Sequence, residues 1–337
     1  MGPRAAAYDS FLLVSFGGPE RAEDVLPFLE RVTAGRGIPP ARVRAVAEHY
    51  YQAGGASPVN ARCRELLAAV GPQLADLGLS PYWGNRNWHP LLEDTVAAMR
   101  DRGMARAVAF VTSAYGGYSS CRQYLDDIAA ARAKVGKGAP EISKLRLYFN
   151  HPGWVQAWSS SVSEAVAKGR QLTDRQVEVF FSAHSVPEAL ARTSPYVEQV
   201  TDAARLAAIG AGVEQWRLVW QSRSGNPASP WLGPDICDAI TASEAGCAVV
   251  VPIGFVCENM EIVHDLDVEA AQAAAATSMP FVRAAAVSGH PAFVRMVADL
   301  VRERLSPRVS PAALGSLGPW PDQCPEEHCP APVHRAS

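Results

Sequence analysis

The chain has 337 residues, a length that predicts two domains with well-buried cores and excludes a single small domain. Its 31 Lys and Arg against 34 Asp and Glu give a formal charge of −3, so there is no basic surplus for a phosphate backbone and nucleic acid is not an expected partner. Charged residues interrupt every hydrophobic segment before it reaches the roughly 18 apolar residues that span a bilayer, so no transmembrane segment is predicted.

Short apolar runs alternate with amphipathic segments along the chain, and the runs are typical of buried parallel strands. The expected strands are 11–16, 81–84, 107–112, 145–149, 177–182, 216–220, 248–253 and 280–285. Helical patterns lie at 154–168, 201–209 and 291–305. Strands separated by helices predict right-handed βαβ crossovers. The expected fold class is therefore α/β, with two similar Rossmann-like halves, each a four-stranded parallel sheet flanked by helices.

The repeat of four strands divides the chain into three parts. We expect an N-terminal half over 1–151, a C-terminal half over 152–306 and a Pro-rich tail over 307–337. The last helix should end near Ser306. The tail has no sustained hydrophobic period, so we expect it to be ordered only by local contacts.

Two features of the sequence indicate the cellular compartment of the protein. The first ten residues lack the apolar core and cleavage site of a secretory signal. The seven cysteines are scattered and odd in number, which does not indicate a disulfide framework. We therefore expect a cytoplasmic protein with reduced thiols, and we take a monomer as the expected state.

In open parallel sheets, ligands bind beyond the carboxyl ends of the strands. The segments that leave the expected strands here contain aromatic residues, glycines and a few polar groups. Neither a G-x-G-x-x-G nucleotide motif after a strand nor a G-x-S-x-G hydrolase elbow occurs. This composition favours a flat apolar ligand with polar edges over a polyphosphate.

One histidine stands at a strand end. His184 directly follows the apolar run 177–183. It is either a hydrogen-bonded core residue or, at the edge where ligands bind, a metal ligand or a base that works near neutral pH.

Three carboxylates follow the strand 248–253. Glu261, Asp265 and Glu269 are spaced i, i+4 and i+8, so on a helix they form one stripe. Such a stripe is either a solvated helix face or a row of oxygen ligands that passes a hydrated divalent cation inward.

At these residues the sequence resembles the ferrochelatase family, and most closely its actinobacterial coproporphyrin III members. The matching segments occur in family order between about residue 10 and residue 305. They are 13–19, 54–58, 84–88, 112–115, 118–121, 182–187, 220–225, 230–234 and 252–261.

The resemblance implies a lyase of heme biosynthesis that inserts ferrous iron into coproporphyrin III between the two halves and releases two protons. His184 and Glu261 match the family's catalytic pair, and either one suits metal binding or proton acceptance. Asp265 and Glu269 complete the expected metal residues. The expected porphyrin-binding residues are Phe16, Ser57, Arg86, Tyr115, Tyr118, Ser119 and Trp231.

Three positions depart from the family pattern. Phe16 replaces a tyrosine found in some bacterial relatives, Asn259 replaces a common histidine, and His264 stands where an aromatic residue is usual. These departures concern metal affinity and metal entry rather than the reaction itself.

Some family members carry a 2Fe-2S cluster, which needs four thiolates. The tail offers only Cys324 and Cys329, with His328 beside them, so a complete site within one chain is not expected.

Alternative functions are a protoporphyrin IX ferrochelatase, a chelatase that inserts cobalt into another tetrapyrrole, and a non-catalytic tetrapyrrole carrier. The presence of both His184 and Glu261 argues against the carrier, which needs no proton acceptor.

Overall fold

The computed structural model describes residues 7–35, 37–224, 229–325 and 328–331. Gly225, the end of the segment 220–225, lies outside these ranges. Among the described residues, no helix combines the length and the apolar character that a membrane crossing requires.

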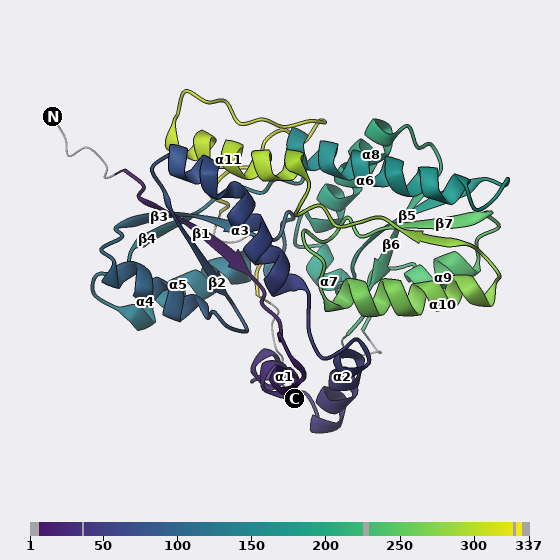
Figure 1. The fold of residues 1–337 in the computed structure, drawn as a ribbon, viewed down its shortest axis with the longest axis horizontal. Coiled ribbons are helices and arrows are strands. Elements are labelled where there is room, and N and C mark those ends of the chain that lie inside the picture. The colour runs from purple at the N-terminus through teal and green to yellow at the C-terminus, as the bar shows by residue number, and fades with distance from the viewer. Residues whose placement is uncertain (1–6, 36, 225–228, 326–327, 332–337) are drawn as a thin grey trace.

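Two four-stranded sheets, in which all strand pairs are parallel, form the centre of the molecule (Figure 1). The first has the order β2-β1-β3-β4 and the second the order β6-β5-β7-β8, so both repeat one topology. The strands of the first sheet are β1 (Ser10–Ser15), β2 (Ser80–Asn85), β3 (Arg106–Val111) and β4 (Glu141–Lys144). Those of the second are β5 (Val177–His184), β6 (Trp216–Gln221), β7 (Cys247–Val251) and β8 (Phe281–Arg283). The predicted fold class is confirmed.

Helices cover both faces of each sheet (Figure 1). The first sheet has α3 (Val59–Asp76) and α11 (Pro291–Leu305) on one face, and α4 (Leu92–Asp101) and α5 (Gln123–Val135) on the other. The second sheet has α6 (Pro152–Arg170) and α8 (Tyr196–Ala211) on one face, and α9 (Ile236–Thr241) and α10 (Ala271–Ala276) on the other. The described helices also include α7 (Glu188–Ala191), the short η1 (Ala22–Asp24) and two π-helical segments, η2 (Tyr118–Arg122) and η3 (Ile262–Ala270).

Alternate residues of each strand face opposite helix layers, as the pleat of a strand requires. In β1, Phe11 and Leu13 pack toward α3 and α11, whereas Leu12 and Val14 pack toward α4 and α5. The layer that contains Phe11 is continuous with the layer that packs on β5 of the second sheet. The two halves therefore share one hydrophobic core.

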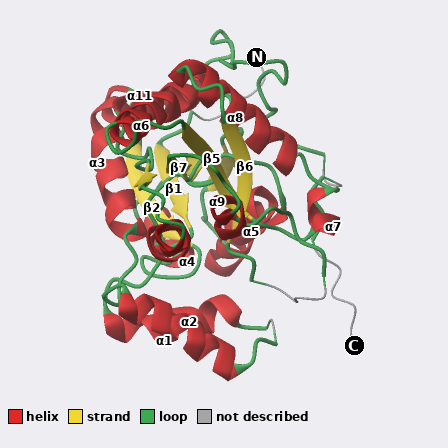
Figure 2. Ribbon diagram, turned by 90° about the vertical axis from the view of Figure 1, so that its right-hand side faces the viewer, coloured by secondary structure: helices red, strands yellow, loops and turns green. Residues whose placement is uncertain are grey.

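The remaining two helices, α1 (Val25–Thr33) and α2 (Pro40–Gln52), form a pair set apart from the helices that flank the sheets (Figure 2). They have a small core of their own, built from Val25, Phe28, Leu29 and Ala47.

The predicted strand 145–149 is wrong, because the fourth strand is β4, which ends at Lys144. The run is apolar because Leu145, Leu147, Tyr148 and Phe149 are buried in the shared core. Arg146 turns away to an ion pair with Glu303 of α11, so the chain leaves the sheet here.

The expectation that the tail is ordered only by local contacts is also wrong. Asn150 Nδ2 donates hydrogen bonds to the carbonyls of Leu314 and Gly318, at 3.1 and 2.8 Å. Arg146 Nη2 donates to Ala312 O at 2.8 Å. These bonds join the described part of the tail to the connection between the two sheets.

Candidate active site

His184 is the last residue of β5 and is held from two sides. Tyr196 Oη donates a hydrogen bond to His184 O at 2.9 Å. The Nδ1 atom of the ring is hydrogen-bonded to Ser185 O, and a carbonyl can only accept, so Nδ1 carries a proton. The Nε2 atom is therefore the one available for chemistry.

Glu261 reaches the same edge because the loop after β7 passes very close to β5. A Cβ atom on Gly254 would lie 2.6 Å from Ala183 Cα, so this approach requires glycine. The loop is fastened by Gly254 N, which donates to Ser182 O at 3.0 Å. Gln221, at the end of β6, accepts from Ser182 Oγ at 2.7 Å and donates from Nε2 to Glu261 O at 3.2 Å.

His184 and Glu261 meet at this edge. Nε2 of the histidine lies 3.5 Å from Oε1 of the glutamate, and their side chains are 33% and 45% exposed. Burial lowers the pKa of His184, but the Glu261 carboxylate and the bond to Ser185 O outweigh it and raise the pKa to about 9. At neutral pH the His184 ring is therefore protonated, and its Nε2 faces Glu261 Oε1.

The other two carboxylates of the stripe lie on η3, which begins directly after Glu261. Asp265 Oδ2 accepts hydrogen bonds from Ser222 Oγ and from Gln221 Nε2. Burial raises the pKa of Asp265, and partial burial raises that of Glu269. Burial thus disfavours the charged form of both carboxylates, and a neighbouring cation would offset this cost more than it would for carboxylates on a fully solvated helix face.

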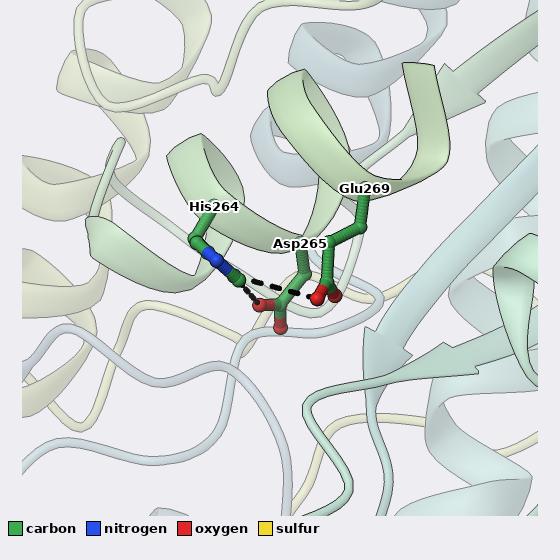
Figure 3. Close-up of side chains that lie close together, drawn as sticks. All are labelled: His264, Asp265 and Glu269. Carbon is green, nitrogen blue, oxygen red and sulfur yellow. Dashed lines mark hydrogen bonds and ion pairs between the residues drawn. The ribbon is translucent and has the colours of Figure 1, made fainter. Parts of the chain in front are cut away.

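A histidine joins these two carboxylates, as Figure 3 shows. Among the described residues, His264, Asp265 and Glu269 form the group whose metal-ligand atoms all lie within 4.8 Å of one another. The sequence singled out His264 only as a departure from the family pattern.

Among the aromatic residues expected to bind the porphyrin, Phe16 is accessible. It follows β1, the residue is 42% exposed, and its ring packs edge-on against that of Phe28, with the centroids 6.3 Å apart. Arg86 lies over the Phe16 ring at 5.8 Å and is itself paired with Asp127 at 2.7 Å. Arg86 therefore supports Phe16 and has its guanidinium already engaged.

Tyr115 lies in the core instead. Its side chain is 1% exposed, its Oη donates to Ile253 O at 2.8 Å, and its ring packs edge-on against Trp154 and Tyr196. In this position the ring joins the two halves and offers no face to a ligand.

The other predicted porphyrin residues differ in accessibility. Tyr118 is half-buried and Ser119 is exposed, and both lie on η2. Ser57 is buried against Gly18. Trp231 is half-buried, with an indole N–H that finds no hydrogen-bond partner among the described residues.

Two residues of α2 also reach the carboxylates, and no signal in the sequence identifies them. His49 stacks on His264, with ring centroids 3.7 Å apart and planes 7° apart. Burial raises the pKa of Tyr50 above its usual range, and the nearby charges of Glu261 and Asp265 raise it further. Helix α2 therefore lies beside the carboxylate stripe.

The structure brings a third thiol to the tail cysteines. Cys121 of η2 lines a small cavity of about 40 Å³ together with Cys324, Cys329 and His328. A four-thiolate cluster still lacks one cysteine among the described residues, and Cys324 Sγ already accepts a hydrogen bond from Trp320 Nε1. These residues therefore do not fit a cluster held by four thiolates.

Comparisons with known proteins agree with this geometry. The ferrochelatase family model matches residues 8–305. A ferrochelatase from Rhodopirellula baltica is 46% identical over 96% of this chain and 93% of its own length. A coproporphyrin III ferrochelatase from Nocardia farcinica is 47% identical over 92% of each chain.

Among solved structures, the sirohydrochlorin chelatase SirB from Bacillus subtilis subspecies spizizenii in complex with cobalt has the same fold. The TM-score is 0.51 at 13% identity, over 88% of this chain and 94% of that chain. The chain therefore belongs to the ferrochelatase family of metal-chelating lyases, which bind a porphyrin and iron in heme biosynthesis.

Proposed function

We propose that this chain inserts ferrous iron into coproporphyrin III and releases Fe-coproporphyrin (coproheme) and two protons. The observation that carries the proposal is the His184–Glu261 pair, with Nε2 and Oε1 3.5 Å apart at the edge where β5 ends. Relatives that are 46–48% identical and named coproporphyrin III ferrochelatase support the choice of porphyrin.

His184 and Glu261 have different roles. Metallation replaces two pyrrole N–H protons with one cation, so bases must stand beside the macrocycle. Because the pKa of His184 is raised to about 9, its Nε2 already carries a proton at neutral pH. Glu261 is therefore the first proton acceptor, and His184 acts as an acceptor or a metal ligand only after its own Nε2 proton has left.

The macrocycle is held by aromatic side chains and by its carboxylates. Phe16 and Trp231 supply flat apolar surface from the two halves. Coproporphyrin has four propionates against the two of protoporphyrin, so it gains more from hydroxyl donors at the rim. Tyr118 and Ser119 are the accessible donors, whereas Ser57 is buried and Arg86 is paired with Asp127.

The carboxylates beyond the pair guide the cation. Asp265 and Glu269 extend from Glu261 along η3, and hydrated divalent cations bind carboxylate oxygens. The iron is a substrate here, and it travels along the stripe to the pair.

The test is an anaerobic assay of Fe(II) insertion with purified protein, comparing coproporphyrin III with protoporphyrin IX. We expect a higher kcat/KM for coproporphyrin III. A higher value for protoporphyrin IX would assign the chain to that substrate instead. Tight binding of either porphyrin without metallation would make it a carrier.

A further inference from the structure

A cavity of about 370 Å³ lies where α6, α11 and the tail meet. Its wall is formed by the first turn of α6, by one side of α11 and by the tail residues Val309, Ser310 and Ala312. None of its lining residues belongs to the candidate active site, and the tail part of the wall lies beyond residue 305, where the family match ends. Pockets of roughly 300–1,000 Å³ hold small molecules.

An unpaired hydrogen-bond donor lies in the wall of this cavity. His151 is only 4% exposed and caps α6, because its Nδ1 accepts a hydrogen bond from Gly153 N at 3.0 Å. Burial lowers the pKa of His151 to about 4, so the ring is neutral and its proton is on Nε2. This N–H finds no hydrogen-bond partner among the described residues. A buried donor of this kind lowers stability unless an acceptor pairs with it.

Glu303 of α11 does not satisfy this donor. Its Oε1 lies 3.9 Å from His151 Nε2, which is beyond hydrogen-bond distance. The same oxygen already accepts from Arg146 Nη2 at 3.1 Å and from Ala312 N at 2.9 Å, and Oε2 accepts from Arg146 Nε at 2.8 Å. His151 and Glu303 both line the cavity, so a molecule that enters it can supply the missing acceptor.

The charged residues of α11 favour a negative ligand. Arg302 Nη1 pairs with Asp299 Oδ1 at 2.8 Å, and Glu303 is paired with Arg146. The side chain of Arg295 makes no ion pair or hydrogen bond within the part of the chain that the structure describes, so one guanidinium of the wall is left over. The cavity also meets the first turn of α6, a 19-residue helix, and anions are stabilised at that end of a helix.

We propose that this cavity binds a small organic anion, whose carboxylate or phosphate oxygens pair with Arg295 and accept a hydrogen bond from His151 Nε2. The inference goes beyond the proposed function and does not depend on it, because the cavity shares no residue with the candidate active site. The cavity volume suits an organic molecule better than a single inorganic ion. A ligand bound here joins α6, α11 and the tail, so it stabilises the folded chain.

The test measures binding of two probes, citrate and glycerol 3-phosphate, to the full-length protein without porphyrin or iron. Calorimetry gives the dissociation constants, and the rise in melting temperature reports binding to the folded state. Citrate presents carboxylates and glycerol 3-phosphate presents a phosphate, so their relative affinities identify the preferred anion. Glycerol is the neutral control. We expect saturable binding of at least one anion and none of glycerol.

Four variants locate the site and fix the sign of its charge. Arg295→Gln should weaken anion binding about ten- to a hundredfold. His151→Asn, which keeps a helix-capping side chain but removes the ring N–H, should weaken it about three- to tenfold. Asp299→Asn should instead strengthen it about two- to fivefold, because Arg302 is released. Arg308→Gln makes the same charge change on an exposed tail residue outside the cavity and should bind like the wild type.

Three results would overturn the proposal. They are no saturable binding of either anion, equal losses of affinity in Arg295→Gln and Arg308→Gln, and weaker binding in Asp299→Asn, which would show that the cavity prefers a cation. Thermal unfolding of each variant without ligand checks the fold, and Arg295 is exposed, so its substitution tests the site even where His151→Asn lowers stability. Failure of the proposed function is distinguishable, because a protein that metallates neither porphyrin would still bind the anion.

Discussion

The two halves of the molecule repeat the same topology and the same uncommon element, but they carry different chemistry. Each half has a π-helical segment after its third strand, η2 in the first and η3 in the second. The first carries Tyr118 and Ser119, which are uncharged, whereas the second carries Asp265 and Glu269. π-Helical turns are rare and frequently mark functional sites. The fold thus supplies two equivalent positions, and the proposed function divides them between holding a ring and handling a cation.

The ends of the central strands show the same division. At the end of β1, Ser15 Oγ accepts a hydrogen bond from Thr112 Oγ1 at 2.9 Å, and Ser15 is also hydrogen-bonded to the Cys63 thiol. At the end of β5, His184 faces Glu261, and both side chains stay partly exposed. Equivalent strand ends can therefore be closed by internal bonds in one half and kept reactive in the other.

The strongest test of this contrast compares the two strand ends directly. His184→Ala should lower kcat for metallation by about 10² to 10⁴-fold, since it removes a proton-handling group, while porphyrin binding stays within about threefold. Stopped-flow metallation and porphyrin fluorescence measure the two quantities. Ser15→Ala is the matched control and should keep kcat within about threefold. Wild-type turnover in His184→Ala would remove the distinction between the halves.

The carboxylates of the second half should differ among themselves. Glu261→Gln should lower kcat about a hundredfold, because this carboxylate is the proposed first acceptor of the pyrrole protons. Asp265→Asn and Glu269→Gln should mainly raise the apparent KM for iron and keep kcat within about threefold. Steady-state assays over a range of Fe(II) concentrations separate the two effects. Equal losses of kcat at all three positions would contradict the inward path.

The same glutamate should control the protonation of its partner. In Glu261→Gln the pKa of His184 should fall from about 9 to below 6.5, because burial still lowers it and the main opposing charge is gone. NMR titration of the imidazole measures this, and Asp265→Asn should lower the pKa less. In the wild type the pair stabilises the fold fully below pH 6.5, and this contribution is lost as the pH rises through about 9. A pKa that does not move in Glu261→Gln would show that the two groups are not coupled.

The π-helical segment η2 of the first half should matter for porphyrin binding and not for the cation. The double variant Tyr118→Phe, Ser119→Ala should weaken binding of coproporphyrin III about ten- to a hundredfold, by removing two donors to propionates. The loss should be smaller for protoporphyrin IX, and the KM for iron should not change. Fluorescence quenching measures both affinities, with Ser120→Ala as the control from the same segment. An equal loss of affinity for both porphyrins would mean that the two hydroxyls do not bind the additional propionates.

The smallest effect concerns the bonds beneath each strand end. Ser182→Ala and Thr112→Val each remove one hydrogen bond and should lower the free energy of unfolding by about 1–3 kcal/mol. Ser182→Ala should also lower kcat by up to about tenfold, because Ser182 orients Gln221, which holds the Glu261 backbone. Denaturant unfolding and metallation assays on both variants check this. A loss of kcat in Thr112→Val as large as in Ser182→Ala would contradict the difference between the strand ends of the two halves.

The sequence predicted those features that depend on local periodicity. Alternation of strands and helices predicted two parallel sheets, and the spacing from Glu261 to Glu269 predicted the carboxylate stripe. The run 145–149 misled because burial at the junction of the halves produces the same apolar pattern as a strand. The stacking of His49 on His264 and the approach of Cys121 to Cys329 join residues from distant parts of the chain. Such contacts are set by tertiary packing, which no short-range pattern encodes.

The position of α11 limits how the molecule can open. This helix packs against α3 of the first half and α6 of the second within the shared core. A hinge rotation of one half against the other would expose that core, and each buried aliphatic side chain would cost about 1.5–3 kcal/mol. The α1–α2 pair has only a four-residue core of its own and can shift with far less exposure. Movement in this fold is therefore expected at the α1–α2 pair rather than between the two halves.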